Sequence, residues 1–350
     1  MTLRGGRWSV LLVLPLLALA VGLIWWRGPD WRVVHDAFTV VRWPWVFAAI
    51  GLNLLSVFAR ALCWETTIMQ SIPKPHPKFR LIFSAFSVGL FANAVLPGRV
   101  GELARVAVLR RRLPGHPKGT TATLIGSVFA HRMFDLFPAV TLVVWVLFAA
   151  KIPAWAITAI AIVLVVGVLL FLGAWGSAKI QHRDALDGLG TVQLMLTRAR
   201  EGLAVMREPV PALSAATFQF AGWLCQLFAV WATMHAFHIY KPLAAAGLVL
   251  VLINVATIFP LWPGNVGLVQ IAVATPLVNY GVAYGRGVAF GIGLQAIEAS
   301  VGVGVGLVFL AREGVSYATL KRVEESDPST PEEIIELVEE PERAGARGSG

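Results

Sequence analysis

The amino-acid sequence predicts an all-α polytopic membrane protein, with about six full transmembrane helices and two re-entrant hairpins arranged as inverted repeats. Three observations lead to this prediction. Hydrophobic residues make up 57% of the chain and charged residues only 14%, a composition typical of membrane proteins rather than of soluble domains. The apolar residues gather in long runs. Two of the runs end at the same Pro-Gly motif, in corresponding places of the two halves.

The first motif lies within residues 93–105, which read Asn-Ala-Val-Leu-Pro-Gly-Arg-Val-Gly-Glu-Leu-Ala-Arg. It follows an apolar run, residues 81–95, that is shorter than the roughly 20 residues a spanning helix needs. Proline and glycine weaken a helix, so a break is expected here. The second motif, residues 262–267, lies 166 residues further on, after the apolar run 242–259. Interrupted helices in corresponding positions of two halves are typical of transporter binding sites.

The other apolar runs predict the full spans. The first, residues 10–26, ends in two tryptophans and lacks a small-residue cleavage site, so an uncleaved span is favoured over a signal peptide. The other five lie at residues 45–69, 120–150, 153–175, 211–237 and 287–311. Residues 179–208 are expected to form a helix at the membrane surface, and a shorter amphipathic stretch lies at 33–41.

The charge distribution divides the chain near residue 312. Ten acidic residues stand against four basic ones from Glu313 onward, whereas the whole chain carries +9. We therefore expect an integral membrane domain at 1–312, with halves at about 1–150 and 153–312, followed by a mostly disordered acidic tail at 313–350. The basic charge predicts contact with anionic lipid headgroups. Nucleic-acid binding is not expected, because no soluble basic domain is present to carry it.

The basic clusters also predict the orientation of the chain. If both broken segments dip into the membrane and return, the clusters near the N-terminus and at 74–80, 110–118, 179–207 and 312–322 all fall on one side. By the positive-inside rule that side is cytoplasmic, which places both termini in the cytoplasm. The first hairpin then enters from the cytoplasm and the second from outside, so the halves are inverted repeats.

Charged residues within the membrane segments are the candidate site. A lone ionised side chain at the bilayer centre costs at least about 2.5–3.5 kcal/mol, so such residues face a cavity or pair with one another. Arginine binds phosphate through two parallel hydrogen bonds, and a restarting helix presents free N–H groups to an anion. The predicted substrate-binding residues are Arg60, Asn93, Pro97, Gly98, Arg99, Gly101, Glu102, Arg105, Arg132, Asp135, Pro263, Gly264, Asn265, Gly267, Gln270 and Glu298.

Within this set, Arg99 and Arg132 are expected to bind a phosphate, with the three carboxylates as their resting partners. Pro97 and Arg132 are 35 residues apart, as are Pro263 and Glu298, so an arginine and a glutamate occupy equivalent positions of the two halves. The alternative is that the charges are buried ion pairs that fix helix packing, with Arg105 extending to the headgroups.

Patterns that would indicate catalysis are missing from the sequence. No His/Cys/carboxylate spacing predicts a metal site, and no nucleophile elbow or phosphate-binding glycine loop is found. His131 and the two cysteines, Cys63 and Cys225, are interpreted as packing residues. We therefore expect no metal, no cofactor and no enzymatic activity.

At these residues the chain resembles the lysylphosphatidylglycerol synthase transmembrane-region family of flippase-like integral membrane proteins, over about residues 11–311. The resemblance rests on Arg60 with Trp64, on Asn-x-x-x-Pro-Gly-Arg-x-Gly-Glu-x-x-Arg at 93–105, on Arg132-x-x-Asp135 and on Pro260-x-x-Pro263-Gly264-x-x-Gly267. It implies a bacterial inner-membrane protein whose relatives form the flippase half of the multiple peptide resistance factor.

The chain departs from that resemblance in two ways. Larger relatives carry a soluble aminoacyl-transferase domain after the membrane region, where this chain has an acidic tail of about 38 residues, so lipid synthesis is not expected. Asn265, Gln270 and Glu298 stand where many relatives carry Gly, Glu and Arg.

Three functions follow as hypotheses. The leading one is translocation of a phospholipid or lipid-linked headgroup between the leaflets of the cytoplasmic membrane. The second is a non-catalytic partner subunit that holds a lipid-modifying enzyme, binding a cytoplasmic protein through the acidic tail. The third, a membrane-embedded lipid transferase using Glu102 or Asp135, would need a nucleophile or metal that the sequence does not show.

Overall fold

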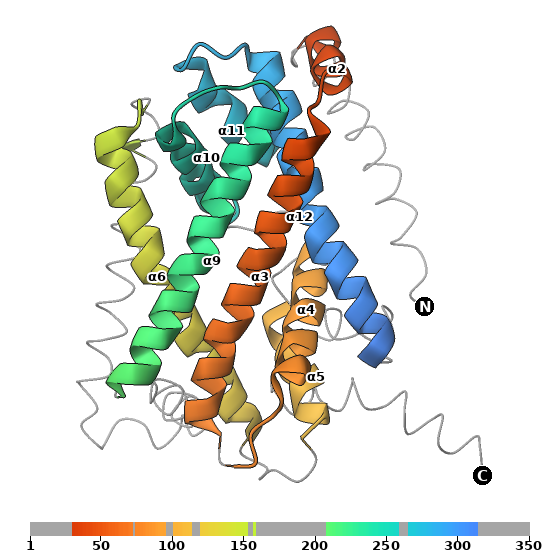
Figure 1. Cartoon of the computed structure of the whole chain (residues 1–350), viewed down its shortest axis with the longest axis vertical. Helices are drawn as coiled ribbons and strands as arrows, with labels where there is room; N and C mark the ends of the chain where they lie inside the picture. Colours follow the sequence, from red (N-terminus) through yellow and green to blue (C-terminus); the bar gives the residue numbers. More distant parts are fainter. Residues whose placement is uncertain are drawn as a thin grey trace, which may run out of the picture.

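The computed structural model describes residues 30–72, 74–95, 101–113, 120–152, 157–158, 208–258 and 265–313. Within these ranges the chain forms a bundle of helices without strands (Figure 1). Helices long and apolar enough to cross a membrane are α3 (Trp43–Ser71), α6 (Thr120–Ala149), α9 (Pro209–Ala236) and α12 (Tyr284–Glu313). The predicted all-α polytopic fold is confirmed. The spans predicted at 10–26 and most of 153–175, the surface segment 179–208 and the acidic tail lie outside the described residues.

Two pairs of shorter helices accompany the long ones. They are α4 (Phe79–Val95) with α5 (Gly101–Arg111), and α10 (Leu243–Ala256) with α11 (Leu268–Val278). Each pair corresponds to one predicted interrupted segment. Figure 1 shows α4 and α5 at the lower end of the bundle and α10 and α11 at the upper end. This placement is the one expected of inverted hairpins; the sides from which they enter a membrane stay a prediction.

A short helix at the upper end, α2 (Trp31–Thr39), replaces the amphipathic stretch expected at 33–41 (Figure 1). Asp30 caps it by accepting a hydrogen bond from the N–H of Arg32 at 3.0 Å. Val34 and Ala37 are buried, and Val33 packs against Gly285 at the start of α12. The helix therefore closes the upper end of the bundle over the beginning of α12.

The two halves meet where α3 crosses α9. Ser56 donates a hydrogen bond to the carbonyl of Gly222 at 2.8 Å, and the Nη2 atom of Arg60 donates to Oε1 of Gln226 at 2.6 Å. Both bonds join residues 166 apart, the spacing of the two Pro-Gly motifs. Equivalent residues touch each other only beside a twofold axis. The axis that relates the halves therefore passes between α3 and α9 near Ser56.

The remaining helices follow the same relation. α3 and α9 are antiparallel, since the N–H of Arg42 donates to the carbonyl of Ala236 at 3.0 Å. The helices α4, α5 and α6 begin within two residues of the 166 spacing from α10, α11 and α12. Packing repeats as well: Trp145 of α6 lies against Gly247 of α10, and Phe91 of α4 lies against Gly306 of α12. The described helices therefore follow the order expected of two inverted repeats, and the inverted orientation in a membrane stays a prediction.

Each hairpin encloses its own apolar cluster. Trp64 and Leu109 are fully buried in the cluster around α4 and α5, and Phe290 and Leu250 in the cluster around α10 and α11. The indole N–H of Trp64 donates to Ser127 at 3.1 Å, so this ring is fixed by a hydrogen bond as well as by packing. Because lipid tails are as apolar as these side chains, close packing rather than exclusion from water holds the helices together.

Candidate functional site

A network of charged and polar side chains crosses the bundle near the midpoints of its four long helices. Its members are Glu102 on α5, Arg132 and Asp135 on α6, Arg60 on α3, Gln219, Trp223 and Gln226 on α9, and Glu298 on α12. The network thus joins both halves of the chain. Its contacts run from Glu102 at one side to Glu298 at the other.

Arg132 holds the first part of the network. Its Nε atom donates to Oε1 of Glu102 at 2.8 Å, and Nη2 donates to the same oxygen. Its Nη1 atom donates to Oδ2 of Asp135 at 3.0 Å, because residues three apart share one face of a helix. The Arg132 side chain nevertheless remains 43% exposed. A large part of this arginine side chain is therefore accessible at mid-depth in the bundle.

Asp135 connects this arginine to the second half. Its Oδ1 atom accepts hydrogen bonds from the indole N–H of Trp223 at 3.0 Å and from the amide of Gln219. The same oxygen lies 3.9 Å from Nη1 of Arg60. Its side chain is 14% exposed. A buried carboxylate needs this number of partners to offset the loss of water.

Arg60 continues the chain of contacts at the twofold axis. Besides its bond to Gln226, its guanidinium carbon lies 5.4 Å from the ring centre of Trp223, a cation–π contact. Gln226 also lies beside the carboxyl group of Glu298. Oε1 of Glu298 and Nε of Arg60 are buried and have no hydrogen-bond partner among the described residues. Arg132 and Glu298, equivalent in sequence, do not pair; Arg60 and Gln226 stand between them.

The first Pro-Gly segment supports the network from the side. The N–H of Gly101, the first residue of α5, donates to Oδ1 of Asn93 at 2.9 Å. The sequence predicted that the N-terminus of this helix presents free N–H groups to an anion. The N–H of Gly101 is not free, because it already donates to Asn93. The bond places Glu102 next to Arg132. The predicted site residues Pro97, Gly98 and Arg99 lie outside the described part of the chain.

The second Pro-Gly segment does not join the network. The N–H of Gly267 donates to Oε1 of Gln270 at 2.5 Å, and Gln270 donates to Gln295 at 2.7 Å. Asn265 donates to the carbonyl of Ala256 at 3.4 Å. Asn265 and Gly267 both have positive φ, which suits asparagine and glycine at a helix start. From Asn265 onward, its described part carries no charged side chain and bonds to its own backbone, to Ala256 and to α12, while Pro263 and Gly264 lie outside the described ranges.

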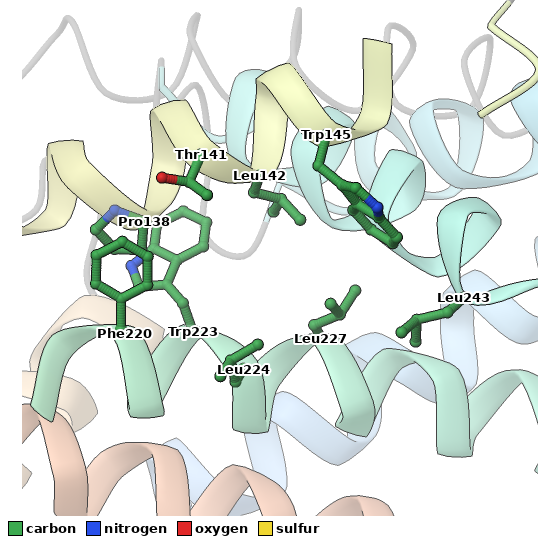
Figure 2. Close-up of a pocket in the computed structure, with 9 residues that line it drawn as sticks. All are labelled: Pro138, Thr141, Leu142, Trp145, Phe220, Trp223, Leu224, Leu227 and Leu243. Atoms are coloured by element: carbon green, nitrogen blue, oxygen red, sulfur yellow. The ribbon is translucent and has the colours of Figure 1, made fainter. Parts of the chain in front are cut away.

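An apolar groove adjoins the network between α6 and α9 (Figure 2). Its volume is about 260 Å³. The lining residues are Pro138, Thr141, Leu142 and Trp145 of α6, Phe220, Trp223, Leu224 and Leu227 of α9, and Leu243 at the start of α10. Figure 2 shows the two rows facing each other across the groove. Trp223 belongs to both features, because its ring lines the groove while its N–H bonds Asp135.

The structure thus places a chain of charged side chains at mid-depth beside an apolar groove. The family described as lysylphosphatidylglycerol synthase TM region matches residues 9–306. The chain belongs to this family. No curated protein and no solved structure matched in the other two searches. The match includes every residue of the network and of the groove.

Membership in the lysylphosphatidylglycerol synthase TM family identifies a multi-pass membrane protein of a lipid-related group. Arg60, Glu102, Arg132 and Asp135, four of the residues that carried the resemblance in the sequence, lie together in the structure. Over the ranges that the structure describes, no group of three or more His, Cys, Asp or Glu side chains could hold a metal ion.

Sequence reasoning missed the three members on α9. Gln219, Trp223 and Gln226 are spaced by four and three residues, so they share one face of an otherwise apolar helix. That spacing of polar residues in an apolar helix could have predicted a polar face on α9. The second signal was the 166-residue offset, which connects Gln226 to Arg60.

Arg105 of this lysylphosphatidylglycerol synthase TM family member is buried in an unusual setting. Only 4% of it is exposed, so the alternative in which it extends to the headgroups is wrong. Its guanidinium carbon lies 4.7 Å from the ring centre of Trp64 and 5.5 Å from that of Phe86. Nε and Nη2 have no hydrogen-bond partner within the described residues. Two aromatic faces thus hold a cation that has two unpartnered donors among the described residues.

We expect the Arg105→Met variant to be as stable as the wild type, or more stable by about 1 kcal/mol. Burying the cation costs at least about 2.5–3.5 kcal/mol, and the aromatic contacts return about 0.5–2 kcal/mol. Unfolding in detergent micelles measures this. Leu109→Ala, which opens a cavity in the same helix, should lose about 2–5 kcal/mol in the same assay. A loss above about 1 kcal/mol for Arg105→Met would show that Arg105 stabilises the fold.

Proposed function

We propose that the protein translocates an amphiphilic lipid, a phospholipid or a lipid-linked headgroup, between the leaflets of the cytoplasmic membrane. One observation carries the proposal: a continuous polar network at mid-depth whose arginine, Arg132, is still 43% exposed and which adjoins an apolar groove. In a bilayer, charged side chains at this depth mark a substrate path.

The proposed headgroup site is the partly exposed guanidinium group of Arg132. Guanidinium binds phosphate through two parallel hydrogen bonds and keeps its charge under all conditions. In the resting protein Glu102 and Asp135 occupy two of its edges. An arriving phosphate would compete with these carboxylates, so the site would be neutral when empty and would exchange one anionic partner for another when filled.

The proposed acyl-chain path is the groove between α6 and α9. Its walls are almost entirely hydrocarbon and aromatic, and Trp223 connects it directly to Asp135. A molecule with a charged head and an apolar tail fits this pair of surfaces, whereas a small polar solute would leave the groove unused. In this role the protein breaks no covalent bond, and we expect no enzymatic turnover.

Translocation of a fluorescent phospholipid in reconstituted vesicles tests the proposal. Arg132→Ala should slow the movement about tenfold or more, because a hydrogen bond to a charged group contributes about 1.5–3 kcal/mol and 1.4 kcal/mol equals a factor of ten. Arg286→Ala, an exposed arginine at the start of α12, is the matched control and should retain the wild-type rate. A folded Arg132→Ala protein as fast as wild type would overturn the assignment.

The partner-subunit hypothesis concerns the acidic tail, residues 313–350, which lies outside the described part. Deleting the tail separates the two hypotheses. If the tail-deleted protein still moves lipid and loses no copurifying protein, translocation is supported. If a copurifying enzyme is lost and lipid movement was never detected, the partner role is supported.

A further inference from the structure

We propose that Glu298 is a proton-binding site whose protonation decides which carboxyl group pairs with Arg60. The site rests on the geometry of the network. The use of the bound proton to drive lipid movement rests on the function proposed above.

Glu298 occupies the one carboxyl position of the network without a cation of its own. Glu102 receives two donors from Arg132, and Asp135 receives Arg132, Trp223 and Gln219. The neutral amide of Gln226 lies beside Glu298, and Oε1 of Glu298 is buried without a partner among the described residues. It lies at the middle of α12, the depth at which an unpaired charge costs most. A bound proton removes that charge.

Within the described ranges, few charged groups near Glu298 could replace the proton. On α3 the facing cation is Arg60, and on α9 the facing group is Gln226. The packed segments of α4 and α11 carry no titratable side chain beyond Arg80 at the start of α4. Charged residues of α2 lie at the far end of α12, near Gly285. On α12 itself Arg286, Arg312 and Glu313 stand at the ends.

Arg60 is placed to respond to the proton. It holds Gln226 at 2.6 Å and approaches Asp135 only to 3.9 Å, and its Nε has no partner in the described residues. With Glu298 protonated, the nearest carboxylate to Arg60 is Asp135, as observed. Loss of the proton would create a second carboxylate on the other side of Gln226 and draw Arg60 toward it. Asp135 would then lose its contact with Arg60 and could bind Arg132 alone.

The equivalent position in the first half makes this arrangement asymmetric. Glu298 and Arg132 are 166 residues apart, so they occupy matching places on either side of the axis at Ser56 and Gly222. One place holds a permanent cation and the other a group that can be charged or neutral. Headgroup binding and proton binding would thus take place at the two matching positions, connected through Arg60 and Gln226.

Infrared spectroscopy of the protein in vesicles tests the site independently of transport. The wild type should show the carbonyl band of a protonated carboxylic acid at neutral pH, and Glu298→Gln should lose it. Glu208→Gln, an exposed glutamate before α9, should keep it. If Glu298→Gln folds poorly, Gln226→Leu provides the second variant, since replacing the polar amide beside the carboxyl group should shift the same band. A band that persists in Glu298→Gln, or its absence from wild type, would overturn the proposal.

Lipid movement under an imposed pH gradient tests the coupling. The wild-type and Glu208→Gln rates should change with the gradient, whereas the Glu298→Gln rate should not. If no lipid moves in wild type while the carboxylic acid band is present, the proposed function fails and the proton site stands. If Glu298 is ionised at neutral pH and responds instead to a lipid bearing a free amine, the group binds an ammonium ion and the proton site is wrong.

Discussion

Replacing Asp135 with alanine is expected to destabilise the protein by about 3–5 kcal/mol. Removing one member of a buried ion pair leaves the others with uncompensated charge. Here a single carboxylate accepts hydrogen bonds from Arg132, Trp223 and Gln219, so three donors would lose an acceptor. Arg60, 3.9 Å away, would lose a neighbouring negative charge. Unfolding of the purified protein in detergent measures the loss. Asp135→Asn should lose less, because its carbonyl oxygen still accepts from the indole.

Asp36 on α2 offers the control for this experiment. Its side chain is 78% exposed and lies outside the network of the candidate site. Its ion-pair contact is with the neighbouring residue His35. Asp36→Ala should change the stability by no more than about 0.5 kcal/mol. If the two alanine variants were equally stable, the network would have no structural role, and its ion pairs would be exchangeable with water.

Gly101→Ala is expected to cost about 1–3 kcal/mol and to slow lipid movement. A Cβ atom at Gly101 would overlap the backbone carbonyl of Gly89 and lie 2.6 Å from Oδ1 of Asn93. Neither can yield easily, since one is backbone and the other is bonded to Gly101 itself. Overpacking of this kind forces neighbouring elements apart. The displaced α5 would also move Glu102 away from Arg132, so both unfolding and transport should report the change.

Gly304 on α12 is the matched glycine. No atom lies within 4 Å of a Cβ built there, and alanine forms helices more readily than glycine by about 1 kcal/mol. Gly304→Ala should therefore leave stability unchanged or raise it slightly. A similar loss at both glycines would mean that α4 and α5 do not approach each other as closely as the structure shows.

The long helices could be predicted from the sequence because an apolar run fixes the length of a membrane helix. The run at 45–69 became α3 at 43–71, and the run at 211–237 became α9 at 209–236. The alternate glycines of α12 were less informative. Gly306 packs closely against Phe91 and Gly302 touches Ala94 loosely, but Gly304 faces open space, because only one face of a helix can meet a neighbour.

The sequence pointed to the charged residues of the candidate site but did not predict which of them contact one another across the two halves. Arg132 and Asp135 pair as their helical spacing requires. Arg132 and Glu298 occupy equivalent positions, yet equivalence places two residues in contact only beside the symmetry axis, where Arg60 and Gln226 already lie. The polar face of α9 was overlooked because amide and indole groups carry no charge to signal a cost in the membrane. Contacts between halves depend on the crossing of α3 and α9, which no local pattern encodes.

The crossing at Ser56 and Gly222 has a consequence for why both halves share one chain. Two identical copies of a half, inserted in opposite directions and docked in the same way, would present the same side chain at both matching places beside the axis. Such a pair could hold two arginines or two glutamates, whose like charges repel. Because one chain encodes both halves, each place can be changed alone, and a cation opposite an acid becomes possible. Joining the halves in one chain therefore allows a cation at one position and an acid at the matching position, which a symmetric dimer is unable to have.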